Sequence, residues 1–181
     1  MADELVIVPY DPNWPLLFSQ LGSRLREALG PIALRIDHIG STSITGLAAK
    51  PILDVQISVA EFDPLDLYRL PLEKLGYVFR AANPELPKRY FREQPGERRT
   101  HIHVRRSGSW AEQFALLFRD YMRSHDEDAQ AYAKLKYHLA EKYQTDRQRY
   151  TDAKAPWIWE IMKKADRWSQ ETGWKPGPTD G

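Results

Sequence analysis

The sequence predicts an α+β fold, with a mixed β-sheet region over about residues 1–108 and a helical region over about residues 109–172. Apolar and polar side chains alternate from Ile52 to Val59, as in a strand with one buried face. Two further strand-like segments flank a Pro-Gly turn and predict a hairpin. After Ser109, apolar residues recur at helical spacing instead. A chain of 181 residues suits one domain, and its end, residues 173–181, is expected to be a flexible tail.

The individual elements follow from this periodicity and from the residues that stop it. Strands are expected over 5–8, 34–39, 52–59, 77–81, 89–92 and 101–105. Helices are expected over 15–29, over 63–75, from 109, over 126–148 and over 155–170. Gly30-Pro31 stops the first helix, and Ser109 with Glu112 three residues later forms a capping-box pattern. Pro156 is expected in the first turn of the last helix, where no N–H is needed.

Small hydroxyl residues join two of the predicted strands. The segment Gly40-Ser41-Thr42-Ser43 follows the strand over 34–39, and the next strand carries Asp54 opposite its apolar face. Glycine lets a backbone approach a ligand closely, and the amides and hydroxyls of such a turn can donate to phosphate oxygens. Asp54 can hold a divalent metal against the same phosphates. The pattern therefore predicts a site for phosphate and metal.

The second strand of the hairpin repeats this arrangement. Its apolar residues face one way, and His101, His103 and Arg105 face the other. If both strands turn their apolar faces to one core, Asp54 and Gln56 share an open face with the two histidines. The sheet would then have helices packed on one face and a polar cleft on the other. Two imidazoles at alternate strand positions suit a shared metal, although ordinary polar pairs have the same spacing.

Composition limits the kinds of partner. The chain has a net charge of +1 and no Cys, which excludes disulfides and thiolate metal sites. No apolar run reaches the ~20 residues of a membrane span, and the acidic start does not resemble a secretory signal. We therefore expect a cytoplasmic protein without a membrane partner. Residues 80–106 hold eight Lys and Arg against three Glu. This excess favours a small anionic ligand over nucleic acid, with a solvated hairpin as the alternative interpretation.

The segment HIGSTSITGLAAKPILDVQI, residues 38–57, resembles the signature of the GrpB family. The resemblance extends through 101–103, 118–121 and 150–158, and so covers most of the chain. Asp37 is a mild departure, because the family commonly has Glu there. The GrpB family is similar to nucleotidyltransferases of the DNA polymerase β superfamily. The resemblance therefore implies a nucleotidyltransferase-like mixed sheet that binds a nucleoside triphosphate and a divalent metal.

The resemblance also implies roles for single residues. Asp54 matches the first carboxylate of an Asp-x-Asp pair, and Ser41 belongs to the Gly-Ser turn, so these two are the predicted catalytic residues. Gln56 stands in place of the second carboxylate, and an amide adds no negative charge. Asp54, His101 and His103 are the predicted metal ligands. The expected metal is Mg²⁺ or Mn²⁺, with Zn²⁺ or Ni²⁺ as alternatives because imidazole suits them better.

The other predicted contacts are with the nucleotide or another phosphorylated small molecule. They are Gly40, Ser41, Thr42, Lys50, Gln56, Arg105 and Lys154. Lys154 lies four residues after Tyr150, so both would face the same way on a helix. Each lysine can neutralise phosphate or can be an ordinary surface cation with its stem on an aromatic ring. Lys136 and Arg119 are weaker candidates, and His38 is interpreted as a structural residue.

Three functions remain open from the sequence. The protein can be a metal-dependent nucleotidyltransferase. It can instead bind a nucleotide or phosphorylated molecule without transfer, which Gln56 favours, or serve as an interaction module with a degenerate site. Hydrolysis by Ser41 with a histidine and Asp54 is disfavoured, because the chain has no Gly-x-Ser-x-Gly elbow.

Overall fold

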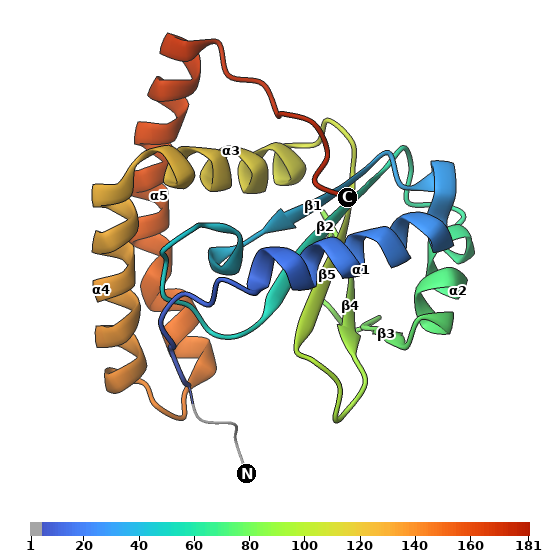
Figure 1. Ribbon diagram of the computed structural model, residues 1–181, viewed down its shortest axis with the longest axis horizontal. Helices are drawn as coiled ribbons and strands as arrows, with labels where there is room; N and C mark the ends of the chain where they lie inside the picture. The colour runs from blue at the N-terminus through green and yellow to red at the C-terminus, as the bar shows by residue number, and fades with distance from the viewer. Residues whose placement is uncertain (1–4) are drawn as a thin grey trace.

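The computed structural model describes residues 5–181, and a five-stranded sheet lies at its centre (Figure 1). Its strands are β1 (Arg35–Ile39), β2 (Leu53–Val59), β3 (Tyr77–Phe79), β4 (Arg89–Glu93) and β5 (Thr100–Arg106). They are arranged in the order β1-β2-β5-β4-β3. The central pair, β2 and β5, is parallel, and every other neighbouring pair is antiparallel. The mixed sheet and the hairpin of β4 and β5 confirm the predicted α+β class.

Within residues 5–181, five α-helices surround the sheet. They are α1 (Trp14–Leu29), α2 (Asp66–Lys74), α3 (Trp110–Ser124), α4 (Asp126–Lys142) and α5 (Arg147–Thr172). Two short 3₁₀ turns cover Gly30–Ile32 and Ser41–Ser43. No helix within residues 5–181 is long and apolar enough to cross a membrane.

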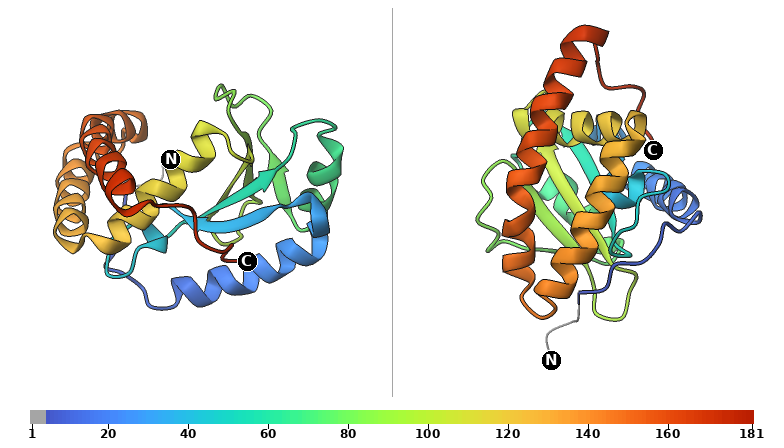
Figure 2. Two further views of the ribbon diagram at one scale, coloured as in Figure 1. Left: turned by 90° about the horizontal axis from the view of Figure 1, so that it is seen from above. Right: turned by 90° about the vertical axis from the view of Figure 1, so that its left-hand side faces the viewer.

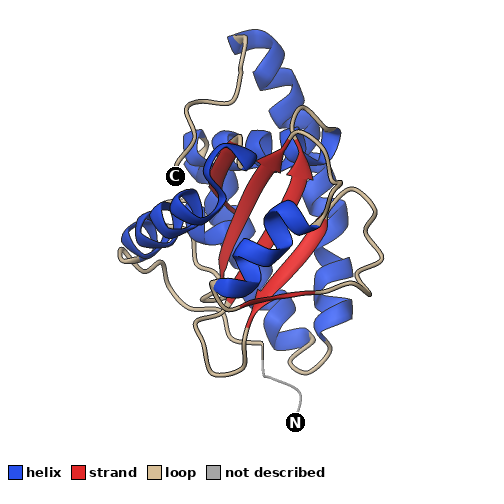
Figure 3. Cartoon of the chain, turned by 90° about the vertical axis from the view of Figure 1, so that its right-hand side faces the viewer, coloured by secondary structure: helices blue, strands red, loops and turns tan. Residues whose placement is uncertain are grey.

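The apolar face of the sheet packs against α1 and α2, and Figure 3 shows the sheet lying between helices. Phe18 and Leu25 of α1 meet Val55 and Ile57 of β2 in this core. A second core joins α3, α4 and α5 (Figure 2, left). Burying each such large apolar side chain contributes about 1.5–3 kcal/mol, so the two cores hold the sheet and the helical region firmly.

Helix α3 covers part of the face that the sequence predicted to be open. The amide nitrogen of Gln56 donates to the carbonyl of Glu112 at 3.3 Å, and the Arg119 guanidinium donates to the carbonyl of His38 at 3.2 Å. Helices therefore lie on both faces of the sheet. Asp54, on the same polar face, keeps a side chain that is 28% exposed.

Three predicted elements differ clearly from the structure. The prediction of a strand over 5–8 is wrong. Within this segment, Val8 alone pairs with another part of the chain, in an isolated bridge with Ala49. The helix expected over 126–148 ends at Lys142, and α5 begins at Arg147, eight residues earlier than predicted. Asp146 causes this early start, because its carboxylate accepts a hydrogen bond from the Arg149 N–H at 3.0 Å and caps the helix. Pro156 consequently lies inside α5.

Residues 173–181 differ from the frayed ending that their composition suggested. They turn back from the end of α5 and lie beside β1 and α1 (Figure 1). The N–H of Gly181 donates to the carbonyl of Ile36 at 3.0 Å. Residues 1–4, where the single-domain prediction begins, lie outside the described part of the chain.

Candidate functional site

The register of β2 and β5 brings the predicted metal ligands together. Asp54 pairs with His101, and Gln56 pairs with His103, across the parallel strands. The apolar residues between them are buried in the core shared with α1. This pairing confirms the predicted shared polar face, because side chains two residues apart on a strand point the same way.

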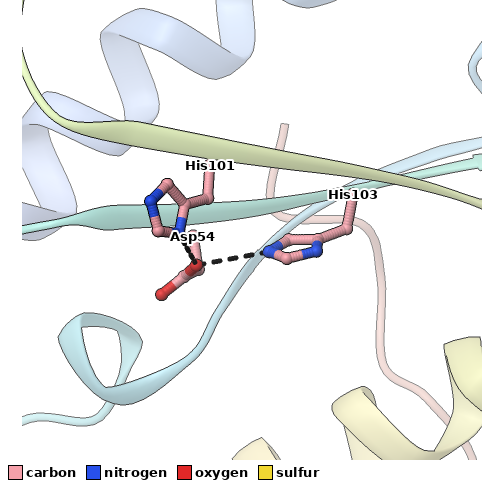
Figure 4. Close-up of side chains that lie close together, drawn as sticks. All are labelled: Asp54, His101 and His103. Carbon is pink, nitrogen blue, oxygen red and sulfur yellow. Dashed lines mark hydrogen bonds and ion pairs between the residues drawn. The ribbon is translucent and has the colours of Figure 1, made fainter. Parts of the chain in front are cut away.

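Asp54 lies between the two imidazoles (Figure 4). Its Oδ1 atom is 3.3 Å from His101 Nδ1 and 3.3 Å from His103 Nε2. Each residue offers one ligand atom, and the three atoms lie within 4.8 Å of one another. The side chain of Asp54 is 28% exposed, so the cluster is reachable from solvent. One carboxylate and two imidazoles are a donor set found around Zn²⁺ and Fe²⁺ more often than around Mg²⁺.

Protonation in this cluster favours metal binding. Burial by itself raises the pKa of Asp54, but the hydrogen bonds from His101 and His103 outweigh it and hold this pKa well below its usual range. Burial lowers the pKa of His103 to about 4, against the opposing effect of Asp54. An ionised carboxylate and a neutral imidazole are the forms that bind metal. The remaining ring nitrogens, His101 Nε2 and His103 Nδ1, are buried without a hydrogen-bond partner.

The Gly40 turn touches Asp54 directly. Gly40 has φ 69° and ψ −175°, a conformation that only glycine adopts readily. A Cβ atom at this position would lie 2.6 Å from Asp54 Oδ2. The backbone of the turn and the Asp54 carboxylate therefore share one small volume, as the sequence predicted. Ser41, the next residue, is half-buried beside Tyr132.

Thr42 supports the turn from inside the protein. It is 1% exposed, and its hydroxyl donates to the carbonyl of Ile52 at 3.1 Å and contacts His38 Nε2 at 3.0 Å. His38 in turn stacks on Phe18 with ring centroids 4.7 Å apart. Burial lowers the pKa of His38 to about 4, so its ring is neutral near pH 7. Thr42 thus holds the turn in place, contrary to its predicted ligand contact, whereas His38 has the structural role expected of it.

Three lysines meet beside Asp54, two of them predicted. Lys50 Nζ lies 5.2 Å and Lys154 Nζ 4.5 Å from the centre of the Tyr150 ring, which confirms that Tyr150 and Lys154 share a helix face. Lys136 Nζ donates to the carbonyl of Ala48. None of these lysines forms an ion pair with another residue in the described part of the chain. This group of three lysines therefore carries positive charge that no ion pair with a carboxylate neutralises in the described part of the chain.

The lysines also shift one another's titration. Burial, with a smaller contribution from the charges of Lys154 and Lys50, lowers the pKa of Lys136 to about 7. Burial and the charge of Lys50 lower the pKa of Lys154 to about 8, whereas Asp54 raises it slightly. Burial is also the main cause of the lowered pKa of Lys50. The sequence indicated Lys136 only as a weaker candidate for phosphate contact, because a sequence does not show where α4 packs and hence which of its lysines are buried.

Gln56 and Arg105, both predicted to contact the nucleotide, form a hydrogen bond with each other. The Gln56 side-chain oxygen accepts a hydrogen bond from Arg105 Nη1, and its nitrogen donates to the Glu112 carbonyl. Gln56 is fully buried, which conflicts with its predicted contact with a ligand. Arg105 retains a buried Nε atom without a partner. The pair anchors the start of α3 to the sheet next to His103.

Further cations and two cavities lie in and around the hairpin of β4 and β5. In the basic hairpin, Arg92 and Arg99 pair with Glu93 at 2.9 Å and 3.2 Å, as in the solvated-hairpin alternative. A cavity of about 480 Å³ lies between α1 and the turn of the hairpin, and another of about 230 Å³ lies beside residues 79–90. None of the predicted site residues lines either cavity, so the predicted cleft around Asp54 is not one of them.

Tyr90 and Tyr132 belong to the site, but the sequence did not lead us to predict them as site residues. The Tyr90 ring lies 5.6 Å from the His101 ring and 5.3 Å from the His103 ring, between centroids. Burial, together with Tyr150 and Asp54, raises the pKa of Tyr132, and a hydrogen bond with Ser41 opposes this rise. The alternation of β4 places Tyr90 opposite Phe91 and could have indicated the first residue. No sequence signal separates Tyr132 from the other aromatic residues of the helices.

Comparisons with known proteins extend this description to most of the chain. The sequence model of a family described as GrpB protein matches residues 4–164. The UPF0157 protein BH1888 of Halalkalibacterium halodurans is 37% identical over 163 residues, which cover 90% of this chain and 83% of that protein. The crystal structure of the conserved protein GrpB from Enterococcus faecalis superimposes with a TM-score of 0.82 and 32% identity. It covers 90% of this chain and 99% of that one.

A more distant likeness concerns the fold alone. The structure of a cytoplasmic RNA terminal U-transferase matches 74% of this chain and 41% of its own, with a TM-score of 0.52 and 14% identity. The mixed sheet described above is therefore a nucleotidyltransferase-like sheet.

Proposed function

The chain belongs to the GrpB family, and we propose that it is a metal-dependent nucleotidyltransferase that takes a nucleoside triphosphate on the face around Asp54. One observation carries this proposal. The Asp54, His101 and His103 cluster stands beside the Gly40 turn and near Lys50 and Lys154, which lie close to Lys136, and none of these lysines forms an ion pair within residues 5–181. A set of metal ligands next to a group of lysines is the arrangement that would bind a metal-bound polyphosphate.

The lysines are the strongest argument for a polyanion. Burying a cation without a partner is unfavourable, and here the burial and mutual repulsion of the lysines lower the pKa of Lys136 and Lys154. A triphosphate would supply the missing negative charge and restore their protonated form. The ammonium groups of Lys50 and Lys154 both lie over the Tyr150 ring, which holds the two cations close to each other.

The geometry fits transfer of a nucleotidyl group. An acceptor hydroxyl would release its proton to solvent and form a bond with the α-phosphorus as the bond to the bridging oxygen breaks, and pyrophosphate would leave with that electron pair. Asp54, His101 and His103 would hold the metal, which would neutralise charge developing on the phosphate oxygens. The backbone at Gly40 and the Ser41 hydroxyl would donate to phosphate, and Lys50, Lys136 and Lys154 would bind the departing pyrophosphate.

Binding without transfer is the second candidate, and Gln56 favours it. Both polar ends of the Gln56 amide are occupied by Glu112 and Arg105, so this position supplies no charge for a second metal ion. Transfer would then depend on a single metal ion. A protein that lost the second carboxylate could retain nucleotide affinity while losing turnover.

Thermal unfolding of metal-stripped protein would test both candidates. Each of the four nucleoside triphosphates is added with Mg²⁺, Mn²⁺, Zn²⁺ or Ni²⁺, and pyrophosphate release is followed in parallel. We expect a metal-dependent rise in Tm of about 5 °C or more at saturating ligand. Asp54→Asn and His103→Ala should lose this rise, because each removes a metal ligand.

Matched controls are Asp152→Asn and His138→Ala, which make the same chemical changes on exposed parts of α5 and α4. A nucleotide shift that persists in both site variants would reject this site. A shift without pyrophosphate release, tested with RNA, protein and small hydroxyl acceptors, would reject transfer and leave the binding function.

A further inference from the structure

The outer edge of β1 is covered by the chain's own segment 177–181. As the first strand in the sheet order, β1 pairs with β2 only, so the polar backbone groups of its other edge need separate partners. The segment reaches this edge after returning from the end of α5 (Figure 2). It lies beyond residues 4–164, which the family model matches. The family model therefore does not describe this contact.

Thr179 and Gly181 fit the edge with specific contacts. The Thr179 hydroxyl accepts a hydrogen bond from the Ile36 N–H at 2.9 Å and donates to the Ile36 carbonyl at 2.7 Å. The Gly181 N–H donates to the same carbonyl at 3.0 Å. A Cβ atom on Gly181 would lie 3.1 Å from the Cα atom of Gly22, so a side chain there would press on α1. The first position therefore requires a hydroxyl group, and the second requires a residue without a side chain.

Asp180 occupies a built carboxylate site. Its Oδ2 atom accepts from the His38 N–H at 2.9 Å and from Arg119 Nη1 at 2.7 Å. Arg119 is 3% exposed and also donates to the His38 carbonyl, so both outer backbone groups of His38 are satisfied. Hydrogen bonds between charged groups of this kind contribute more than neutral ones. Arg119 also pairs with Asp120 at 2.7 Å and with Asp37 at 3.5 Å, so Asp180 completes a group of three carboxylates around one buried arginine.

We propose that the outer edge of β1, together with Arg119, is a peptide-docking surface that recognises an extended Thr-Asp-Gly segment, and that residues 177–181 are its ligand within this chain. Recognition through a strand edge combines backbone hydrogen bonds with pockets for particular side chains. Both kinds of contact occur here. The docked segment is separable in principle, because it makes these contacts through three consecutive residues at the end of a Pro- and Gly-containing connection.

A peptide added in trans would test this surface in the protein of residues 1–181. The peptide covers residues 174–181 (WKPGPTDG), with a fluorophore at its start and an amidated end. The protein variant carries Thr179→Val and Asp180→Asn, which change polarity with little change in shape. We expect the peptide to bind this variant with a Kd at least about tenfold lower than for the unaltered protein. The internal segment, at an effective concentration in about the millimolar range, should block the unaltered protein.

A peptide carrying the same two substitutions is the matched control and should bind neither protein. Equal binding of both peptides, equal binding to both proteins, or no binding to the variant up to about 1 mM would each overturn the proposal. Hydrogen exchange gives an independent measurement if the double variant does not fold. Asp180→Asn alone should then reduce protection of the Ile36 and His38 amides and leave Val55 unchanged, and unchanged protection at all three would also overturn it. No nucleotide enters either experiment, so the result is independent of the proposed transferase function.

Discussion

At the scale of single residues, the site depends on a contact between Gly40 and Asp54. Gly40 combines a positive φ with a distance of 2.6 Å between its hypothetical Cβ and Asp54 Oδ2. Any side chain would be strained by the backbone and would push the carboxylate away from the histidines. The sequence correctly indicated a close backbone approach at this glycine. Only the structure shows that the neighbour it approaches is the metal-ligand carboxylate itself.

Gly40→Ala separates these two effects when it is compared with Gly108→Ala. Gly108 also has a positive φ, +73°, but a Cβ atom there meets nothing within 4 Å. We expect Gly108→Ala to lower the free energy of unfolding by about 1–2 kcal/mol through backbone strain alone. Gly40→Ala should cost more and should also abolish the metal-dependent rise in Tm. The interpretation fails if Gly40→Ala keeps normal metal affinity in calorimetric titration.

At the scale of elements, the start of α3 links the helical region to the sheet. The predicted capping box forms in part, since the Glu112 N–H donates to Ser109 Oγ at 3.3 Å. The Glu112 carboxylate, however, accepts from the Gly108 N–H at 2.6 Å, one residue before the expected position. The Glu112 carbonyl receives the Gln56 amide. A local signal therefore placed the helix start, and its contact with the sheet fixed where the helix points.

Removal of this cap by Ser109→Ala should lower the free energy of unfolding by about 1 kcal/mol. The loss arises because the Glu112 N–H at the start of α3 would have no side-chain partner. Urea unfolding followed by circular dichroism would measure it. Ser107→Ala is the matched control, because Ser107 is exposed and lies outside the helix, and it should change stability by less than about 0.5 kcal/mol. Equal losses for the two variants would argue against the cap.

At the scale of the whole molecule, the group of Lys50, Lys136 and Lys154 is assembled from three distant segments. Lys50 precedes β2, Lys136 belongs to α4 and Lys154 belongs to α5. The second hydrophobic core and the smaller core around Tyr150 hold these elements together. Apolar packing therefore brings the charges together against their mutual repulsion. The folded protein without a ligand should carry a measurable penalty for this arrangement.

That penalty predicts how stability changes with pH. Unfolded lysines stay protonated to about pH 10.4, whereas the pKa of Lys136 is about 7 and that of Lys154 about 8 in the folded protein. Unfolding therefore takes up protons above about pH 7, and the free energy of unfolding should rise with pH from there to about pH 9.5. The lysines should contribute on the order of 1–3 kcal/mol to this rise.

Urea unfolding at several pH values would measure the effect. Lys136→Met with Lys154→Met should flatten the rise, because both titrating groups are removed. Lys134→Met, an exposed change on the same helix as Lys136, is the matched control and should leave the slope unaltered. A slope that is the same in all three proteins would show that these lysines titrate normally.

The amino-acid sequence by itself determined the local patterns of this protein. Alternation placed Asp54, His101 and His103 on polar strand faces, and the Pro-Gly turn made β4 and β5 neighbours. These features depend on the strand period and on turn chemistry, which act over a few residues. The predicted start of α5 was wrong. Pro156 suggested a first turn near residue 155, but the cap at Asp146 starts the helix at Arg147.

Tertiary structure alone decided the features that depend on distant segments. The parallel pairing of β2 with β5 joined the metal ligands, and the docking of α4 and α5 buried Lys136 next to Lys154. The contact of Asp180 with Arg119 likewise joins residues 61 positions apart. The identity of a charged or polar residue in a sequence does not show whether its side chain is exposed or buried. Its burial and its partners are set only when the apolar cores fix where each element lies.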